Sequence, residues 1–263
     1  MVENTYQVKA YLSVFHQTEI GKKIGDCEIG FENNRYFLSK TISSNSRKEA
    51  EDKGKRRINQ VLSTLCLHTG VSYRIDSFQV DQISGEEPHL HSSNIIFKRI
   101  TLLPLRDETV MRADETLKIL DRLPNEKPAE IIERAINYFL RGCYLETEWR
   151  SESFLNFYKV IELLAQDYRK EFNQAFNDKL KDTLFELTEK EIQDLTTQTR
   201  IIRFMCAQLG IGDDNVPQIV KLRATFSAHA TLDEPSVSEE NFNNCKILAS
   251  NSLISYIKKH HAE

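Results

Sequence analysis

Residues 129–165 read AEIIERAINYFLRGCYLETEWRSESFLNFYKVIELLA, and this stretch decides the fold of the larger part of the chain. Its apolar residues recur every three or four positions, the spacing of one face of an α-helix. We therefore predict two consecutive amphipathic helices, one opened by Pro128 and running from about 129 to 148, the other from about Ser151 to Glu171. The stripe residues are Ile132, Ala135, Ile136, Phe139 and Cys143 in the first helix, and Phe154, Phe157, Tyr158, Ile161, Leu164 and Ala165 in the second.

The helical pattern continues on both sides of this stretch. One further helix is expected before it, and the others follow it. Asp213, Asp214 or Asn215 can cap a helix that has Pro217 near its first turn, and the last helix is expected from Ser236 or Ser238 to Lys259. The remaining predicted helices cover 107–123, 178–187 and 189–208. These segments predict an all-α domain over residues 105–263.

Before Pro104 the pattern is different, because β-branched and aromatic residues alternate in short runs. Strands are expected at 5–15, 72–83 and 94–103, and two more in 26–40 around a tight turn at Asn33-Asn34. A long helix is expected from Ser46 to His68, with Gly70 as its C-terminal stop. Residues 1–104 are therefore predicted to form a small α+β domain with about five strands and one long helix.

The composition excludes several classes of protein. The chain has 263 residues, a net charge of −4 and only 9 glycines and 6 prolines, about half the usual share of these two residues. Its N-terminus does not resemble a secretory signal, and no window is long and apolar enough to predict a membrane span. Five widely spaced cysteines argue against a disulfide framework and a clustered zinc site. We expect a cytoplasmic protein with mostly buried thiols, and with no metal, cofactor or membrane partner.

Most chemical motifs are absent from the sequence. It contains no glycine-rich phosphate loop of standard spacing, no His-Glu-x-x-His and no Gly-x-Ser-x-Gly. His89 and His91 fall in a predicted polar loop without a second cluster of metal ligands. The basic run at 47–57, RKEAEDKGKRR, is interpreted as a solvated helix face, and a phosphate-contacting patch is the alternative.

Glu162 is an unusual residue in the second helical stripe. It follows Tyr158 by four positions, which places the two side chains within about 40° of each other around the helix. A carboxylate at the edge of an apolar stripe must either reach water or meet a cation or hydrogen-bond donors. We expect Arg223 to lie within ion-pair distance of Glu162.

The segment KLRATFSAHA, residues 221–230, carries the second informative pair. Ile219, Leu222 and Phe226 form an apolar stripe, and Arg223 and His229 flank it. The two residues are six positions apart, which places their side chains about 120° from each other around an ideal helix. The two side chains can converge only if the helix ends or bends before His229, and TLDEPS from Thr231 has the composition of a helix exit.

RAINYFLRGCY, FLNFYKVIELLA with its embedded Glu162, and LRATFSAH together resemble the HEPN superfamily of helical domains, in particular its ApeA-like branch. The resemblance covers roughly residues 107–260. It implies that Arg223 and His229 take the places of the Arg and His of a metal-independent ribonuclease centre, and that Glu162 takes the place of the family's helix carboxylate. Accessory proteins of methylamine utilisation, of the MauJ type, look similar in length and in their C-terminal domain.

The resemblance also implies a homodimer in which the motifs of two chains form one cleft, and an RNA or nucleotide partner. The leading hypothesis is an HEPN-type ribonuclease, in a toxin or phage-defence setting. Two departures from the family pattern weigh against catalysis: Ala224 replaces a polar residue after the Arg, and five residues rather than four separate Arg223 from His229. The alternatives are a catalytically silent dimeric module that binds a nucleotide, RNA or protein, and an accessory protein whose motif stabilises the core.

Overall fold

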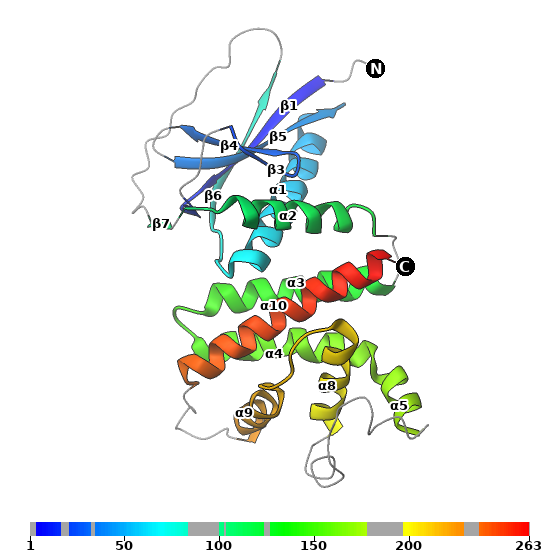
Figure 1. Cartoon of the computed structure of the whole chain (residues 1–263). Coiled ribbons are helices and arrows are strands. Elements are labelled where there is room, and N and C mark those ends of the chain that lie inside the picture. The colour runs from blue at the N-terminus through cyan, green and yellow to red at the C-terminus, as the bar shows by residue number, and fades with distance from the viewer. Residues whose placement is uncertain are drawn as a thin grey trace. The chain divides into compact units, whose positions relative to one another are not determined.

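The computed structural model describes residues 4–16, 21–32, 35–83, 100–102, 104–123, 127–177, 197–228 and 237–262. The chain forms two compact units, residues 1–121 and residues 122–263. Figure 1 shows an antiparallel sheet with helices in the first unit, and helices in the described part of the second. The predicted class, an α+β part followed by a helical part, is confirmed. No helix in the described ranges is long and apolar enough to cross a membrane.

The first unit is built on a five-stranded sheet of order β3-β4-β5-β1-β6, and its neighbouring strands are all antiparallel. The expected hairpin is present, because Glu32 pairs with Arg35 on either side of Asn33-Asn34. The two asparagines themselves lie outside the described residues. The strands are β1 (Asn4–Leu12), β3 (Lys23–Ile24), β4 (Cys27–Glu32), β5 (Arg35–Ser44) and β6 (Ile75–Gln82).

The strand expected at 94–103 does not join this sheet. Its described part is β7 (Ile100–Leu102), which pairs in parallel with β2 (Val14–His16) in a separate two-stranded sheet. The fifth strand of the main sheet is β3 instead. Two residues are too few to show the alternation by which a strand is found in a sequence, so β3 was not predicted.

Helix α1 (Arg47–Thr69) packs on the sheet, and it begins and ends at the expected caps. The Ser46 hydroxyl accepts a hydrogen bond from the Glu49 amide at 3.2 Å. Gly70, with φ of 68°, ends the helix in the left-handed conformation that glycine adopts without strain. The buried core of the unit consists of Tyr6, Val8, Ala10, Leu12, Ile24, Cys27, Ile29, Leu38, Ala50, Ile58, Val61, Leu62, Leu65, Val80, Leu105, Val110, Ala113 and Leu117.

Gly54 lets α1 approach the sheet closely. A methyl group at this position would lie 2.5 Å from Cγ2 and 2.6 Å from Cβ of Val8 on β1. These distances are far below van der Waals contact, so any larger residue would push the helix away from the sheet. The glycine in the middle of this helix therefore has a packing role that outweighs its low helix propensity.

Helix α2 (Asp107–Leu120) belongs to the first unit, although we expected it to open the helical domain. Val110, Ala113 and Leu117 are buried in the core that the sheet and α1 share. The boundary therefore follows Asp121 and not residue 104. An apolar stripe predicts a helix with a buried face, but it does not say which core receives that face.

The second unit contains α3 (Lys127–Leu145), α4 (Arg150–Asp167), α5 (Arg169–Asn177), α8 (Thr197–Leu209), α9 (Val216–Ala228) and α10 (Glu239–Ala262). The helix expected over 151–171 divides at Tyr168 into α4 and α5. The helix expected at 178–187 and the first part of the one at 189–208 lie outside the described residues. Every predicted stripe residue of α4 is buried, and all those of α3 are buried except the half-buried Ile136.

Close packing joins α3, α4 and α10. A methyl group on Gly142 of α3 would lie 2.6 Å from the Phe157 ring of α4, so the two helices touch at this glycine. The buried Ser153 hydroxyl donates a hydrogen bond to the Gly142 carbonyl at 2.6 Å. On α10, Phe242 meets the Phe157 ring edge to face, and Tyr256 donates a hydrogen bond to Asp167 at 2.8 Å. Helix α4 is therefore the element on which the site described next is built.

Candidate functional site

Arg223 lies over the buried ring of Tyr158 on α4, and Glu162 lies one turn further along the same helix. The guanidinium carbon of Arg223, on α9, lies 5.7 Å from the centre of this ring. Glu162 follows Tyr158 by one helical turn, and its charge acts on the Tyr158 hydroxyl. The structure thus brings Arg223 and Glu162 to one side chain from helices far apart in the sequence.

A second ring contact fixes how α9 lies against α4. Phe226 on α9 lies 5.7 Å from Phe154 on α4, measured between ring centres. Phe154 precedes Tyr158 by one turn of α4, and Phe226 follows Arg223 by about one turn of α9, so the two helices touch at two successive turns. Phe154, Tyr158 and Glu162 form a row on α4 with one residue per turn. Arg223 therefore stands opposite the middle of the row, with Phe226 opposite one end.

The electrostatic surroundings of Tyr158 come from three other helices as well as α4. Burial and the charge of Glu162 raise the pKa of its phenol to about 12, while the charge of Arg223 and the neighbouring Gln198 act in the opposite direction. Gln198 lies on α8, and Cys245 on α10 adds a smaller effect. Within the described ranges the buried Nε2 of Gln198 meets no acceptor at normal hydrogen-bond geometry. The site therefore combines a cation, a carboxylate, a phenol and an amide.

The ion pairs found between described residues do not include the one expected between Glu162 and Arg223. Both charges instead flank Tyr158, and both side chains are half-buried. The four-residue spacing on the helix correctly placed Glu162 beside Tyr158. It could not show that the aromatic ring, and not the carboxylate, meets the arginine, because that depends on how α9 packs against α4.

His229 lies outside the described residues. Helix α9 is described as far as Ala228, so His229 is the next residue along the chain. The convergence of His229 with Arg223 stays a prediction. His89 and His91 also lie outside the described residues.

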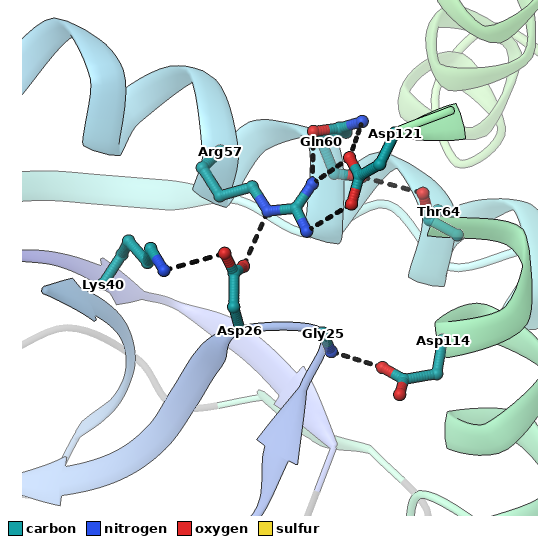
Figure 2. Close-up of polar contacts among 8 residues, drawn as sticks. All are labelled: Gly25, Asp26, Lys40, Arg57, Gln60, Thr64, Asp114 and Asp121. Carbon is teal, nitrogen blue, oxygen red and sulfur yellow. Dashed lines mark hydrogen bonds and ion pairs between the residues drawn. The ribbon is translucent and has the colours of Figure 1, made fainter. Parts of the chain in front are cut away.

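A second polar cluster lies in the first unit, around Arg57 on α1 (Figure 2). The Nε of Arg57 donates to Asp26 at 2.6 Å, while Nη1 and Nη2 donate to the two carboxylate oxygens of Asp121 at 2.6 and 2.9 Å. Asp26 also pairs with Lys40 at 2.7 Å, and Gln60 accepts a further bond from Arg57 at 2.8 Å. The arginine thereby joins α1, the turn before β4 and the residue that follows α2.

The Arg57 cluster behaves as a structural clamp. Burial works to raise the pKa of Asp26, but hydrogen bonds from Lys40 and Arg57 outweigh it, so this pKa lies below its ordinary value of 3.8. Near Asp26, the amide of Gly25 donates to Asp114 of α2 (Figure 2). The Asp26 carboxylate is thus held ionised by two cations of the chain itself, Lys40 and Arg57.

Part of the basic run at 47–57 is paired with carboxylates of the chain itself. Lys53 pairs with Glu49 at 2.7 Å and Lys55 with Glu51 at 2.5 Å, both one turn apart on α1. Arg47 donates to the carbonyl of Val80 at 3.1 Å. These intramolecular contacts favour the solvated helix face over a phosphate-binding patch.

The five cysteines are buried and carry free thiols, as the spacing predicted. Burial raises the pKa of Cys27 and of Cys206 to about 12 and raises that of Cys245 further. At neutral pH these three thiols are protonated and shielded, which makes them poor nucleophiles.

Among the residues that the structure describes, no group of three or more His, Cys, Asp or Glu side chains is arranged to hold a metal ion. Comparisons with protein-family models, with curated proteins and with solved structures found no match to this chain. The site at Tyr158 is therefore interpreted from its own chemistry and from the resemblance of its motifs.

Proposed function

We propose that the helical unit is an HEPN-type module that cleaves RNA without a metal ion, with Arg223, His229 and Glu162 as its site residues. The observation that carries the proposal is the position of Arg223 over the Tyr158 ring, one helical turn from Glu162, since the resemblance assigns Arg223 and Glu162 to one centre. The helical architecture, closed by the long α10, fits the same reading.

The residues suit the chemistry of RNA cleavage by the neighbouring hydroxyl. In this reaction the 2′-oxygen attacks the phosphorus, the bond to the 5′-oxygen breaks, and a 2′,3′-cyclic phosphate forms. His229 removes the proton of the 2′-hydroxyl or donates one to the leaving oxygen, because an imidazole changes its charge near neutral pH. Arg223 binds the non-bridging phosphate oxygens, whose negative charge develops in the transition state.

Glu162 acts through the electrostatics of the site. It follows Tyr158 by one turn of α4, and its negative charge favours a cation at Arg223. In this proposal Glu162 helps to keep the guanidinium group over the ring rather than extended into solvent.

Each chain supplies one histidine, His229, to the proposed site, whereas the reaction needs both a base and an acid. The proposal therefore includes a homodimer in which the site of one chain is completed by His229 of the other. The setting that fits is a cytoplasmic toxin or defence system, in which RNA cleavage is controlled by partners.

The competing function is a catalytically silent module that binds RNA, a nucleotide or a protein. Ala224 and the five-residue gap between Arg223 and His229 favour it, as does the net charge of −4. This reading keeps Arg223 as a binding group and assigns no proton transfer to His229.

The experiment compares cleavage of total RNA, in the presence of EDTA, by the wild type and by Arg223→Ala and His229→Ala. We expect the wild type to cleave RNA and to leave 2′,3′-cyclic phosphate ends, and we expect no cleavage by Arg223→Ala or His229→Ala. Lys221→Ala is the matched control, since it removes an exposed cation from α9 two residues before Arg223. Binding of RNA without cleavage by the wild type would select the silent module, and equal cleavage by all proteins would indicate a contaminating nuclease.

A further inference from the structure

The Tyr158 ring is a buried aromatic surface on which a charged side chain rests. Tyr158 is only 2% exposed, yet the guanidinium carbon of Arg223 lies 5.7 Å from its centre. An arginine on an aromatic ring is attracted by the negative face of the ring, and the attraction strengthens as water is excluded. The ring thus offers Arg223 a defined place at the edge of the helical core.

The position of this ring is fixed by the packing of α4. Phe154 and Phe157, on the preceding turn of α4, are fully buried, and so is Ile161 on the next. Phe154 also meets Phe226, which lies three residues after Arg223 on α9. A side chain held on a rigid helix can hold a neighbouring group to within a fraction of an ångström, which a solvent-exposed partner cannot do.

The motif LRATFSAH points to an arginine and a histidine, whereas the sequence indicates Tyr158 only as a member of the apolar stripe of its own helix. We propose that Tyr158 is a positioning residue that fixes the guanidinium group of Arg223 for the phosphate, acting through its ring and not through its hydroxyl. This inference rests on the proposed function. It adds a residue that contacts Arg223 and does not contact the reacting atoms.

The ring and the hydroxyl of Tyr158 make separate predictions. The hydroxyl is held protonated at neutral pH, because burial and the charge of Glu162 raise its pKa to about 12. It therefore has no role as a proton acceptor under ordinary conditions. If the ring is what holds Arg223, Tyr158→Phe keeps the function and Tyr158→Leu loses it.

The test measures kcat and KM for RNA cleavage by the full-length wild type, Tyr158→Phe, Tyr158→Leu and Phe172→Leu. A displacement of about 1 Å at a reacting group can cost about 100-fold in rate, so we expect a fall of this size in kcat for Tyr158→Leu. We expect kcat of Tyr158→Phe to stay within about threefold of the wild type, because Phe keeps the aromatic face. Phe172→Leu is the matched control, since it removes a buried ring from α5 that contacts Phe204 of α8.

Two outcomes would overturn the inference: equal kcat values for Tyr158→Leu and Phe172→Leu, or a loss for Tyr158→Phe as large as for Tyr158→Leu. If Tyr158→Leu does not fold, a ring-fluorinated phenylalanine at position 158 replaces it. Fluorine keeps the shape of the ring and weakens its negative face, so kcat should fall in this variant relative to Tyr158→Phe, and an unchanged kcat would refute the inference.

The failure of the proposed function would look different. If Arg223→Ala cleaves RNA at the wild-type rate, the proposed function is wrong, whatever the rates of the Tyr158 variants. A double-mutant cycle of thermal stability between Tyr158→Leu and Arg223→Ala then tests the contact without any activity. Additive shifts in melting temperature would show that the ring does not hold Arg223. Non-additive shifts would support the contact between the ring and Arg223, although the proposed reaction would be refuted.

Discussion

Replacing Arg57 with alanine is expected to loosen the attachment of α2 to the sheet unit. Arg57 donates to Asp26 and, through two parallel hydrogen bonds, to Asp121. Its side chain is 16% exposed, whereas those of Asp26 and Asp121 are 46% and 43% exposed. The variant would leave Asp26 with Lys40 alone and would take the cation away from Asp121.

The size of the effect follows from these contacts. A hydrogen bond to a charged group contributes about 1.5–3 kcal/mol, while an ion pair in solvent contributes about 0–1 kcal/mol. The Arg57 cluster lies between these limits, because the arginine is largely buried and its partners are partly solvated. We expect the free energy of unfolding of the first unit to fall by about 2–3 kcal/mol.

The assay is urea unfolding followed by circular dichroism, with hydrogen exchange to locate the change. Arg112→Ala is the matched control, because Arg112 lies on α2 itself and pairs with Glu108, but its side chain is 63% exposed. This control should change the free energy by less than about 0.5 kcal/mol. In Arg57→Ala the amides of α2 should exchange faster than in the wild type. Equal effects of the two substitutions, or unchanged exchange in α2, would refute the clamp.

Three further predictions follow from the described contacts. Gly54→Ala should destabilise the first unit by about 1–3 kcal/mol in a urea titration, because the new methyl group would overlap Val8. Helix propensity alone predicts the opposite, so a stabilised variant would contradict the close approach of α1 to the sheet. The free energy of unfolding of the wild type should fall as the pH rises from 10 towards 12, because the unfolded state releases the Tyr158 proton near pH 10.0 and the folded state only near pH 12. Thermal melts of Tyr158→Phe should show a shallower loss of stability over this pH range. Identical pH profiles of the two proteins would argue against the buried phenol. Light scattering at micromolar concentration should give twice the 30.5 kDa of one chain, and a monomer mass would remove the shared cleft from the proposal.

Local signals in the sequence predicted much of the fold. Ser46 and Gly70 marked the ends of α1, and the alternating runs around Asn33-Asn34 marked the β4–β5 hairpin. The stripes of α3 and α4 are in the core. Each of these features is set by residues within one element or one turn, so the pattern alone carried the information.

Features that depend on residues far apart were not predictable in the same way. Helix α2 was assigned to the wrong unit, because its stripe does not identify the core that receives it. The partners of Arg57 lie 31 and 64 residues away, so the basic run gave no sign of the clamp. In the candidate site the helical wheel joined Glu162 to Tyr158, but the approach of Arg223 on α9 is a matter of tertiary packing.

The rate of RNA cleavage by Arg223→Ala in EDTA, relative to the wild type, tests the central claim most directly. Removing one preorganised donor to the developing phosphate charge costs about 100- to 1000-fold in kcat, and we expect a loss of this size. Lys221→Ala, measured beside it, should retain the wild-type rate, and circular dichroism should show that all three proteins are folded. A folded Arg223→Ala protein that cleaves RNA at the wild-type rate would contradict the account.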